Sequence, residues 1–352
     1  MISVTDVNLG TENSPVSSFP NLNSSILSTI DYSITNGSVH RHEEFIEIFE
    51  VPVGIVAFLS VCYGAVSLVA VIGNACVLWV VASRRRMRTV TNYFISNLAL
   101  ADIVIGLFAV PFQFQAALLQ KWLLPAFLCA FCPFVQVLSV NVSVFTLTAI
   151  AFDRYRAVLH PLKRRGTSKL SAKLTILGIW LVGAIAAAPY VAAFRVTSVF
   201  NPETGDYTRP FCTNTRISPT VWGIYNYLLA TLQYALPLCL ISFAYGRMAL
   251  RLRGNGGFIK APRDEVILKN KKKVIKMLAI VVALFAVCWL PFQTYNVLQE
   301  VLPQINEYKY INVIWFSAHW LAMSNSCYNP FIYAIYNVST VFYIPFFMLY
   351  CC

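Results

Sequence analysis

The sequence predicts an all-α membrane protein, a seven-transmembrane helix bundle whose N-terminus lies outside the cell. Composition is the first reason, because 58% of the 352 residues are hydrophobic and only 12% are charged, whereas soluble domains carry about 25% charged residues. The second reason is that seven apolar runs recur with short connections. The third is that Lys and Arg collect in the connections on one side of these runs.

Each apolar run is long enough to cross a hydrocarbon core of about 30 Å as a helix. The runs are 54–82, 91–118, 129–153, 171–193, 219–249, 274–301 and 310–336. We therefore divide the chain into an N-terminal tail, a seven-helix bundle and a short apolar C-terminal tail, at 1–53, 54–336 and 337–352.

The positive residues orient the bundle. Segments 84–88, 154–173 and 247–276 hold 4, 7 and 10 Lys and Arg, which is 21 of the 27 in the chain. Positive loops stay in the cytoplasm, so these three segments are expected inside the cell. The net charge of +12 is then explained by an anionic inner leaflet and a protein partner, and nucleic acid is not expected as a partner.

The first fifty residues read as a disordered, glycosylated extracellular tail. They carry seven acidic residues and a single base, Arg41, with glycosylation sequons at Asn23 and Asn36. No signal peptide is visible, because no basic start precedes an apolar core. The first transmembrane run is expected to serve as the insertion signal.

The third run ends in a charged triplet that carries a family resemblance. From Cys129 to Asp153 it would extend about 36 Å as a helix, and it continues as AFDRYRAVLHPL. This segment resembles the cytoplasmic end of the third helix in rhodopsin-family G-protein-coupled receptors. The other runs carry motifs in the matching order: Gly73-Asn74, Asn97 to Asp102, Trp180, Pro237 with Tyr245, Phe285 with Cys288-Trp289-Leu290-Pro291, and Asn329-Pro330 with Tyr333.

The resemblance covers about 54–336 and implies a plasma-membrane receptor that activates a heterotrimeric G protein and is not an enzyme. It assigns a switching role to the residues Asp153, Arg154, Tyr155, Tyr245, Phe285, Trp289, Pro291, Asn329, Pro330 and Tyr333. Proline bends a helix because it removes a backbone hydrogen bond. A bent sixth run could swing its basic cytoplasmic end, although both proline kinks could also be static.

Asp102 is expected to be the only acid in the membrane-embedded part. A carboxylate at this depth must be paired, neutralised or hydrated. The resemblance implies a sodium ion held by Asp102 with polar residues of the third and seventh helices, namely Ser143, Asn325, Ser326 and Asn329. The alternative is a protonated aspartate in a structural hydrogen-bond network that also includes Asn74. Apart from this ion no cofactor is expected.

Two of the ten cysteines fall at loop-side positions on the outer face. Cys129 begins the third run, and Cys212 lies in the polar loop 195–218, which faces an oxidising compartment. A disulfide between them would tie the loop across the top of the bundle. Cys132 is the alternative partner, but it lies one helical turn further into the membrane.

The outer half of the bundle is expected to hold the ligand, in a pocket of amides and aromatic rings without a buried acid. The candidates are Gln113, Gln136, Tyr190, Gln233, Phe292, Gln293, Asn296, Trp315 and His319. A small amine ligand needs a carboxylate or an aromatic cage, and Gln136 stands where amine receptors have an aspartate. Retinal is disfavoured as a ligand because Trp315 to Tyr333 contains no lysine for a Schiff base. The pocket suits an uncharged, amidated peptide.

The seventh run narrows the resemblance to peptide receptors. Trp320 to Ser324 followed by Tyr328-Asn329-Pro330 resembles the tachykinin-receptor group, and VLPQINEYKYINVIWFSAHWLAMSNSCYNPFIYAIYN is more similar to invertebrate kinin (leucokinin) receptors. That implies a kinin-like neuropeptide and a Gq-type protein that releases calcium, with a tachykinin-like peptide as the alternative. A transporter or channel is disfavoured, because carriers usually show inverted repeats and several polar breaks.

The last fifteen residues, VSTVFYIPFFMLYCC, lack any charge. A membrane-surface helix needs a charged face, so this stretch does not match the amphipathic helix that the resemblance implies. Two interpretations stay open. Either the chain diverges from the family after Asn337, or the stretch is a hydrophobic anchor with Cys351 and Cys352 as acylation sites.

Overall fold

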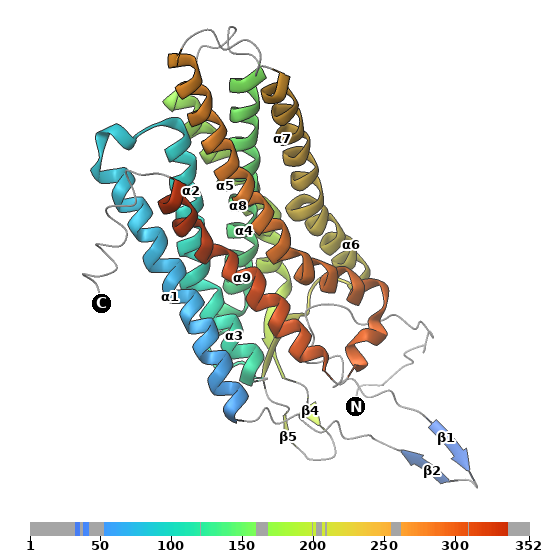
Figure 1. The fold of residues 1–352 in the computed structure, drawn as a ribbon. Helices are drawn as coiled ribbons and strands as arrows, with labels where there is room; N and C mark the ends of the chain where they lie inside the picture. The colour runs from blue at the N-terminus through green and yellow to red at the C-terminus, as the bar shows by residue number, and fades with distance from the viewer. Residues whose placement is uncertain are drawn as a thin grey trace.

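The fold is known from a computed structural model, shown in Figure 1. It describes residues 32–35, 38–41, 53–119, 121–159, 168–198, 200–201, 206–207, 210–254, 262–308 and 310–336. The predicted glycosylation sites Asn23 and Asn36 and the apolar C-terminal stretch lie outside the described residues.

Each of the seven predicted runs forms one transmembrane segment. They are α1 (Val53–Ser83), α2 (Val90–Phe108) with α3 (Val110–Leu119), α4 (Ala126–Leu159), α5 (Lys169–Ala193), α6 (Pro219–Ala230) with the π-helical turn η2 (Thr231–Ala235) and α7 (Leu236–Gly254), α8 (Pro262–Val301) and α9 (Ile311–Tyr336). Short 3₁₀ turns are η1 (Arg85–Met87) and η4 (Pro303–Glu307). The predicted seven-helix class is confirmed.

By length and composition, six of the described segments are long and apolar enough to cross a membrane. The last segment, α9, has 26 residues and is more polar, because its middle holds His319 and the run Ser324, Asn325 and Ser326. These side chains are buried, so they face other helices and avoid lipid. Polar residues in membrane helices are expected at such interfaces.

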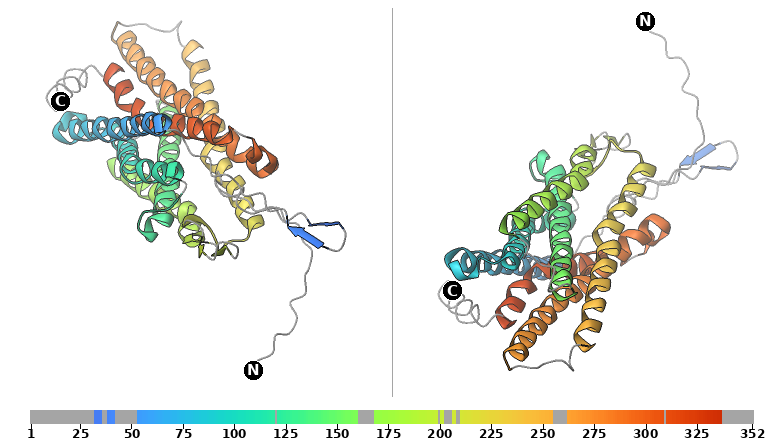
Figure 2. Two further views of the ribbon diagram at one scale, coloured as in Figure 1. Left: turned by 90° about the horizontal axis from the view of Figure 1, so that it is seen from below. Right: turned by 90° about the horizontal axis from the view of Figure 1, so that it is seen from above.

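The helix α4 lies inside the bundle, where it contacts α2, α5, α7 and α8. The end-on views of Figure 2 show it surrounded by the other segments. The helix α9 packs between α1 and α8. Large apolar side chains such as Phe58 and Ile185 point outward, with 67% and 73% exposure. An apolar outer surface around a polar interior is what lipid requires of a membrane bundle.

Proline and glycine shape the segments at three places. The second segment breaks at Ala109, two residues before Pro111. In the fifth, the π-helical turn η2 comes just before Pro237, where the lost backbone donor favours a local change of pitch. Gly73 of α1 lies against the ring of Pro330 in α9, and a Cβ at this glycine would stand 3.1 Å from the proline Cγ. This contact brings α1 and α9 close together.

Short strands lie at the outer end of the bundle (Figure 1). Strand β3 (Phe194–Thr197) pairs antiparallel with β6 (Phe211–Asn214), and β4 (Phe200–Asn201) pairs with β5 (Asp206–Tyr207). In the tail expected to be disordered, β1 (Tyr32–Thr35) pairs with β2 (Ser38–Arg41). The expectation of disorder therefore does not hold for these two strands.

A buried hydrogen-bond chain joins α2, α4 and α5. The indole of Trp180 donates to Asn97 at 2.8 Å, and the Asn97 amide donates to Thr146 at 2.8 Å.

Replacing Asn97 by Leu is expected to destabilise the detergent-solubilised protein by about 1–3 kcal/mol, because it leaves the indole N–H of Trp180 without an acceptor. Thermal unfolding measures this. Thr148→Val is the control, since Thr148 bonds only a carbonyl of its own helix; an equal loss there would contradict the network.

Candidate ligand pocket and switch residues

A cavity of about 90 Å³ lies between the outer halves of α4, α5, α6 and α8. Its polar lining consists of amides, tyrosines and a carboxylate, and its apolar lining includes two tryptophans, Trp222 and Trp289. Trp289 belongs to α8, just before Pro291, the proline that lies inside this helix. A ligand in the cavity would therefore contact α8 close to its proline.

Six of the nine residues predicted for the pocket line this cavity. They are Gln136 on α4, Tyr190 on α5, Gln233 on η2, and Phe292, Gln293 and Asn296 on α8. The amide of Gln233 also donates to the carbonyl of Val137 at 3.3 Å, so this glutamine bridges two helices as well as lining the cavity.

The other three predicted residues, Gln113, Trp315 and His319, do not line it. His319 stacks on Trp315 with ring centroids 4.8 Å apart, and its Nδ1 lies 3.0 Å from the hydroxyl of Tyr63 on α1. Both rings are buried in an aromatic contact between α1 and α9. Ligand contact therefore stays a prediction for these two aromatic residues, whose rings pack against each other in the structure, that of His319 also against Tyr63.

Glu300 was missed by the sequence reasoning and corrects the expectation of a pocket without an acid. This half-buried carboxylate lines the cavity near the end of α8. It also shows that Asp102 is not the only acid in the predicted spans. Helical spacing could have revealed it, because Gln293, Asn296 and Glu300 stand at positions i, i+3 and i+7 and share one face.

Cys129 and Cys212 form a disulfide that fastens a β-hairpin to the head of α4. Cys212 belongs to β6 and pairs with Val196 of β3. A second tie follows from the backbone of Trp122, whose N–H donates to the carbonyl of Pro210 at 2.6 Å. The hairpin β3–β6 is thereby held at the outer end of the bundle, beside the helices that form the cavity.

Asp102 lies buried between α2 and α9. The Asn329 amide donates to its carboxylate at 2.8 Å, and Ser326 lies close to the carboxylate as well. Asn74 of α1 donates to the Ser326 carbonyl at 2.9 Å. Among the described contacts neither Ser143 nor Asn325, also predicted for this cluster, reaches the carboxylate. The structure thus brings three of the five predicted sodium-site residues together.

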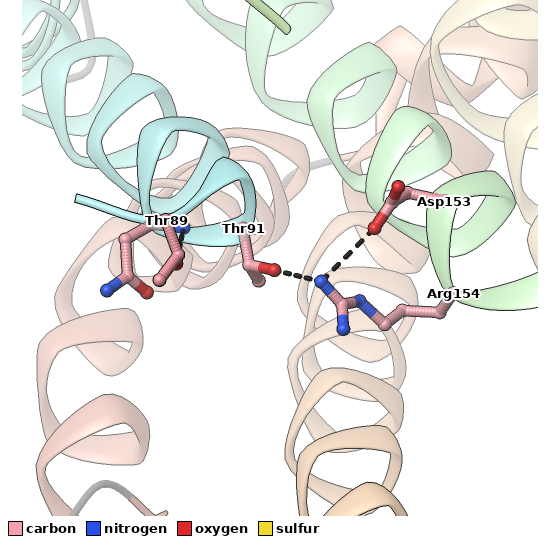
Figure 3. A network of polar contacts seen from close by, with 5 residues as sticks. Thr89, Thr91, Asp153 and Arg154 are labelled. Atoms are coloured by element: carbon pink, nitrogen blue, oxygen red, sulfur yellow. Dashed lines mark hydrogen bonds and ion pairs between the residues drawn. The ribbon is translucent and has the colours of Figure 1, made fainter. Parts of the chain in front are cut away.

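At the opposite end, Arg154 connects α4 to α2 (Figure 3). Its guanidinium forms an ion pair with Asp153 at 3.1 Å and a hydrogen bond with the hydroxyl of Thr91. Tyr155, the third residue of the triplet, packs against Phe243 of α7 with ring centroids 6.4 Å apart. The contacts of Asp153 and Arg154 hold the guanidinium near its own helix and α2.

Aromatic contacts run along α8 from the cavity towards the cytoplasmic half. Trp289 stacks on Phe285 at 5.9 Å between ring centroids, and Phe285 contacts Tyr234 of η2 at 6.4 Å. The hydroxyl of Tyr234 donates to the carbonyl of Ala286 at 2.8 Å. Further along, Tyr245 is half-buried and Tyr333 is buried, both packed on the main apolar core. The predicted switch residues thus lie on α4, α7, α8 and α9.

The resemblance to rhodopsin-family receptors implies a G-protein partner, and on that expectation replacing Asp153 by Asn should raise basal nucleotide exchange on the G protein about fivefold, since a partly exposed ion pair contributes about 1 kcal/mol or less. The change frees Arg154 from its ion pair while keeping the shape of the side chain. Basal GTPγS binding in membranes at equal receptor density measures it. Thr91→Ala removes the other contact without removing a charge and should raise exchange less. Unchanged basal exchange in the asparagine variant would contradict a restraining role for the pair.

Comparison with known proteins places these features in a family. Residues 73–333 match the 7 transmembrane receptor (rhodopsin family) profile. The tachykinin-like peptides receptor 99D of Drosophila melanogaster is 36% identical over 79% of this chain and 54% of its own length. The neuromedin-K receptor of Oryctolagus cuniculus is 37% identical over 80% and 59%, and the RYamide receptor of D. melanogaster is 37% identical over 78% and 60%.

This chain spans little more than half the length of these relatives. The matched part nevertheless contains the cavity, the disulfide, the buried aspartate and the charged triplet at the end of α4. The family consists of multi-pass membrane receptors and not of enzymes, which agrees with the sequence prediction. With its seven membrane segments and a match over residues 73–333, the chain belongs to the rhodopsin family of seven-transmembrane receptors.

Proposed function

We propose that this chain is a plasma-membrane receptor for an amidated neuropeptide of the tachykinin-like or RYamide-like type. The observation that supports this most directly is the cavity, where amides and aromatic rings line the walls beneath a disulfide-tied hairpin. Backbone amides and a terminal carboxamide of a peptide would find donors and acceptors in Gln136, Gln233 and Gln293. Relatives named for tachykinin-like peptides and for RYamide support the same ligand class.

The signalling partner in this proposal is a heterotrimeric G protein. Peptide binding beside Trp289 would change the packing of Phe285 and the angle of α8 at Pro291. The cytoplasmic end of α8 carries the exposed lysines Lys272, Lys273 and Lys276. Its outward movement, together with release of Arg154 from Asp153, would open a surface for the partner. We further propose that this partner is a Gq-type protein whose activation releases calcium.

A kinin-like peptide is a second, more specific candidate for the ligand. It is favoured by the run from Val301 to Asn337, which resembles kinin receptors. The relatives named above instead carry tachykinin-like, neuromedin-K and RYamide names, so these peptides come first among the candidates.

We also propose that Asp102 holds a sodium ion in the resting receptor. The donor types fit, because carboxylate, hydroxyl and amide oxygens suit a small hard cation. Asp102 and Ser326 would supply ligands, and Asn74 has a buried carbonyl oxygen without a protein partner. The ion would supply positive charge that lets the buried carboxylate stay ionised between α2 and α9.

A peptide panel in cells tests the proposal. Neuromedin K, an insect tachykinin-like peptide, an RYamide peptide and a kinin would each be applied to cells expressing the chain, with calcium release recorded alongside GTPγS binding. We expect at least one amidated peptide to activate the receptor, and its free-acid form to be at least about tenfold weaker, since a buried carboxylate would replace a neutral amide. Ion current or solute uptake without G-protein activation would favour a channel or transporter instead.

A further inference from the structure

Among the described residues that line the cavity, Glu300 is the one that carries a charge. It stands near the outer end of α8 and faces α6. Its Oε1 accepts a hydrogen bond from the Asn226 side-chain amide at 2.8 Å. Its Oε2 lies 3.2 Å from the position that a Cβ on Gly223 would occupy. Two residues of α6, Asn226 and Gly223, therefore fix where this carboxylate stands.

Within the described part of the chain, no Lys, Arg or His forms an ion pair with the Glu300 carboxylate. The ion pair found there joins Asp153 and Arg154 at the other end of the bundle. A half-buried charge loses part of its hydration, and this cost is recovered only by a partner of opposite charge or by hydrogen bonds. Asn226 supplies one hydrogen bond through its amide. The second carboxylate oxygen is left for a group that enters the cavity.

Because Gly223 has no Cβ, Oε2 of Glu300 can lie close to the backbone of α6. Any larger side chain there would press on Oε2 and shift it by a few tenths of an ångström. With glycine, the carboxylate packs directly against α6 and its head remains at the cavity wall. Tyr190 and Trp222 also line the cavity, and the faces of aromatic rings attract cations.

We propose that Glu300 is a specificity residue that binds a cationic group of the peptide, with Asn226 and Gly223 positioning its carboxylate. This inference rests on the proposed peptide-receptor function. The group is a guanidinium or ammonium on a side chain, or the free N-terminal amine. The amides and aromatic rings deeper in the cavity bind the uncharged part of the peptide. The expectation of an uncharged peptide is thereby replaced by that of a peptide with at least one positive charge.

The test changes the charge of the peptide and the charge of residue 300 in the receptor. Each peptide of the panel would be made in three forms: unmodified, with its N-terminal amine acetylated, and with every Arg replaced by citrulline and every Lys by norleucine. They would be assayed on the wild-type chain and on Glu300→Gln. The glutamine carbonyl can still accept the hydrogen bond from Asn226, so the variant keeps the α6–α8 contact while losing the charge.

We expect the unmodified active peptide to lose at least about tenfold in potency on Glu300→Gln, as removal of one partner of a partly desolvated pair usually does. The form that lacks the relevant cation should be weak on the wild-type chain and should lose nothing further on the variant. Loss on acetylation identifies the N-terminal amine, and loss on citrulline or norleucine replacement identifies a side chain. Asp206→Asn, which removes an acid of strand β5, should leave potency unchanged.

Charge reversal distinguishes recognition from a structural role. Glu300→Arg should be activated better by a peptide whose cationic residue is replaced by Glu than by the unmodified peptide, which a merely structural role would not produce. Equal potency of charged and neutral forms on the wild-type chain, or an equal loss for both on Glu300→Gln, would overturn the inference and leave the receptor function standing. If no peptide activates the wild-type chain, the inference falls with the proposed function.

Discussion

Cells that express Cys129→Ser or Cys212→Ser are expected to show no specific peptide binding at their surface. The disulfide joins the head of α4 to strand β6, and removing such a bond typically costs about 2–5 kcal/mol. In this chain the bond has a positional role as well. Without it, the backbone bond from Trp122 to Pro210 is the remaining described polar tie between the loop before α4 and the β6 segment, and the hairpin beside the cavity would lose its fixed place.

Radioligand binding on intact cells, normalised to surface level by an N-terminal tag, measures this loss. The double serine variant should be no worse than either single variant, because the first substitution already breaks the bond. Cys132→Ser is the matched control, since Cys132 is a buried free thiol one turn further along α4. Clearly additive losses in the double variant, or loss of binding in the control, would mean that the two cysteines are not partners.

The helices could be predicted because their signal is carried by many residues at once. Seven apolar runs and the distribution of Lys and Arg fix the number and orientation of the spans, and single polar residues such as those of α9 do not erase the pattern. Breaks within a span depend on a few residues. The break at Ala109 and the π-helical turn before Pro237 alter the local hydrogen bonding while leaving the hydropathy of each run unchanged, so only the structure shows them.

The residues that line the pocket are harder to predict, because the rotation of each helix about its axis decides which side chains face the cavity. The sequence predicts Gln293 and Asn296 as lining residues, but it does not single out Glu300 on the same face, because Glu300 stands at the end of its span. Trp315 and His319 have the chemistry of ligand contacts, but stacking between their rings and the bond to Tyr63 use them within the bundle. Composition alone does not distinguish a side chain that faces a ligand from one that faces a neighbouring helix.

Replacing Asp102 by Asn is expected to remove the sodium dependence of agonist binding while leaving surface expression close to that of the wild-type chain. Asparagine has nearly the same shape and can still accept the bond from Asn329, which holds α2 to α9 at 2.8 Å. It lacks the negative charge that a sodium ion needs. In the wild-type chain sodium should weaken agonist binding about 5- to 150-fold, the usual range for coupling between two sites.

Agonist competition curves in sodium chloride and in potassium chloride at equal ionic strength separate ion binding from charge screening. The wild-type curves should shift between the two salts, and those of Asp102→Asn should superimpose. Asp153→Asn serves as the control, because it removes an acid at the cytoplasmic end of α4, away from the buried cluster, and should keep the shift. A wild-type chain that binds agonist equally well in both salts has no functional sodium site. In that case Asp102 belongs to a purely structural hydrogen-bond network with Asn329 and Ser326.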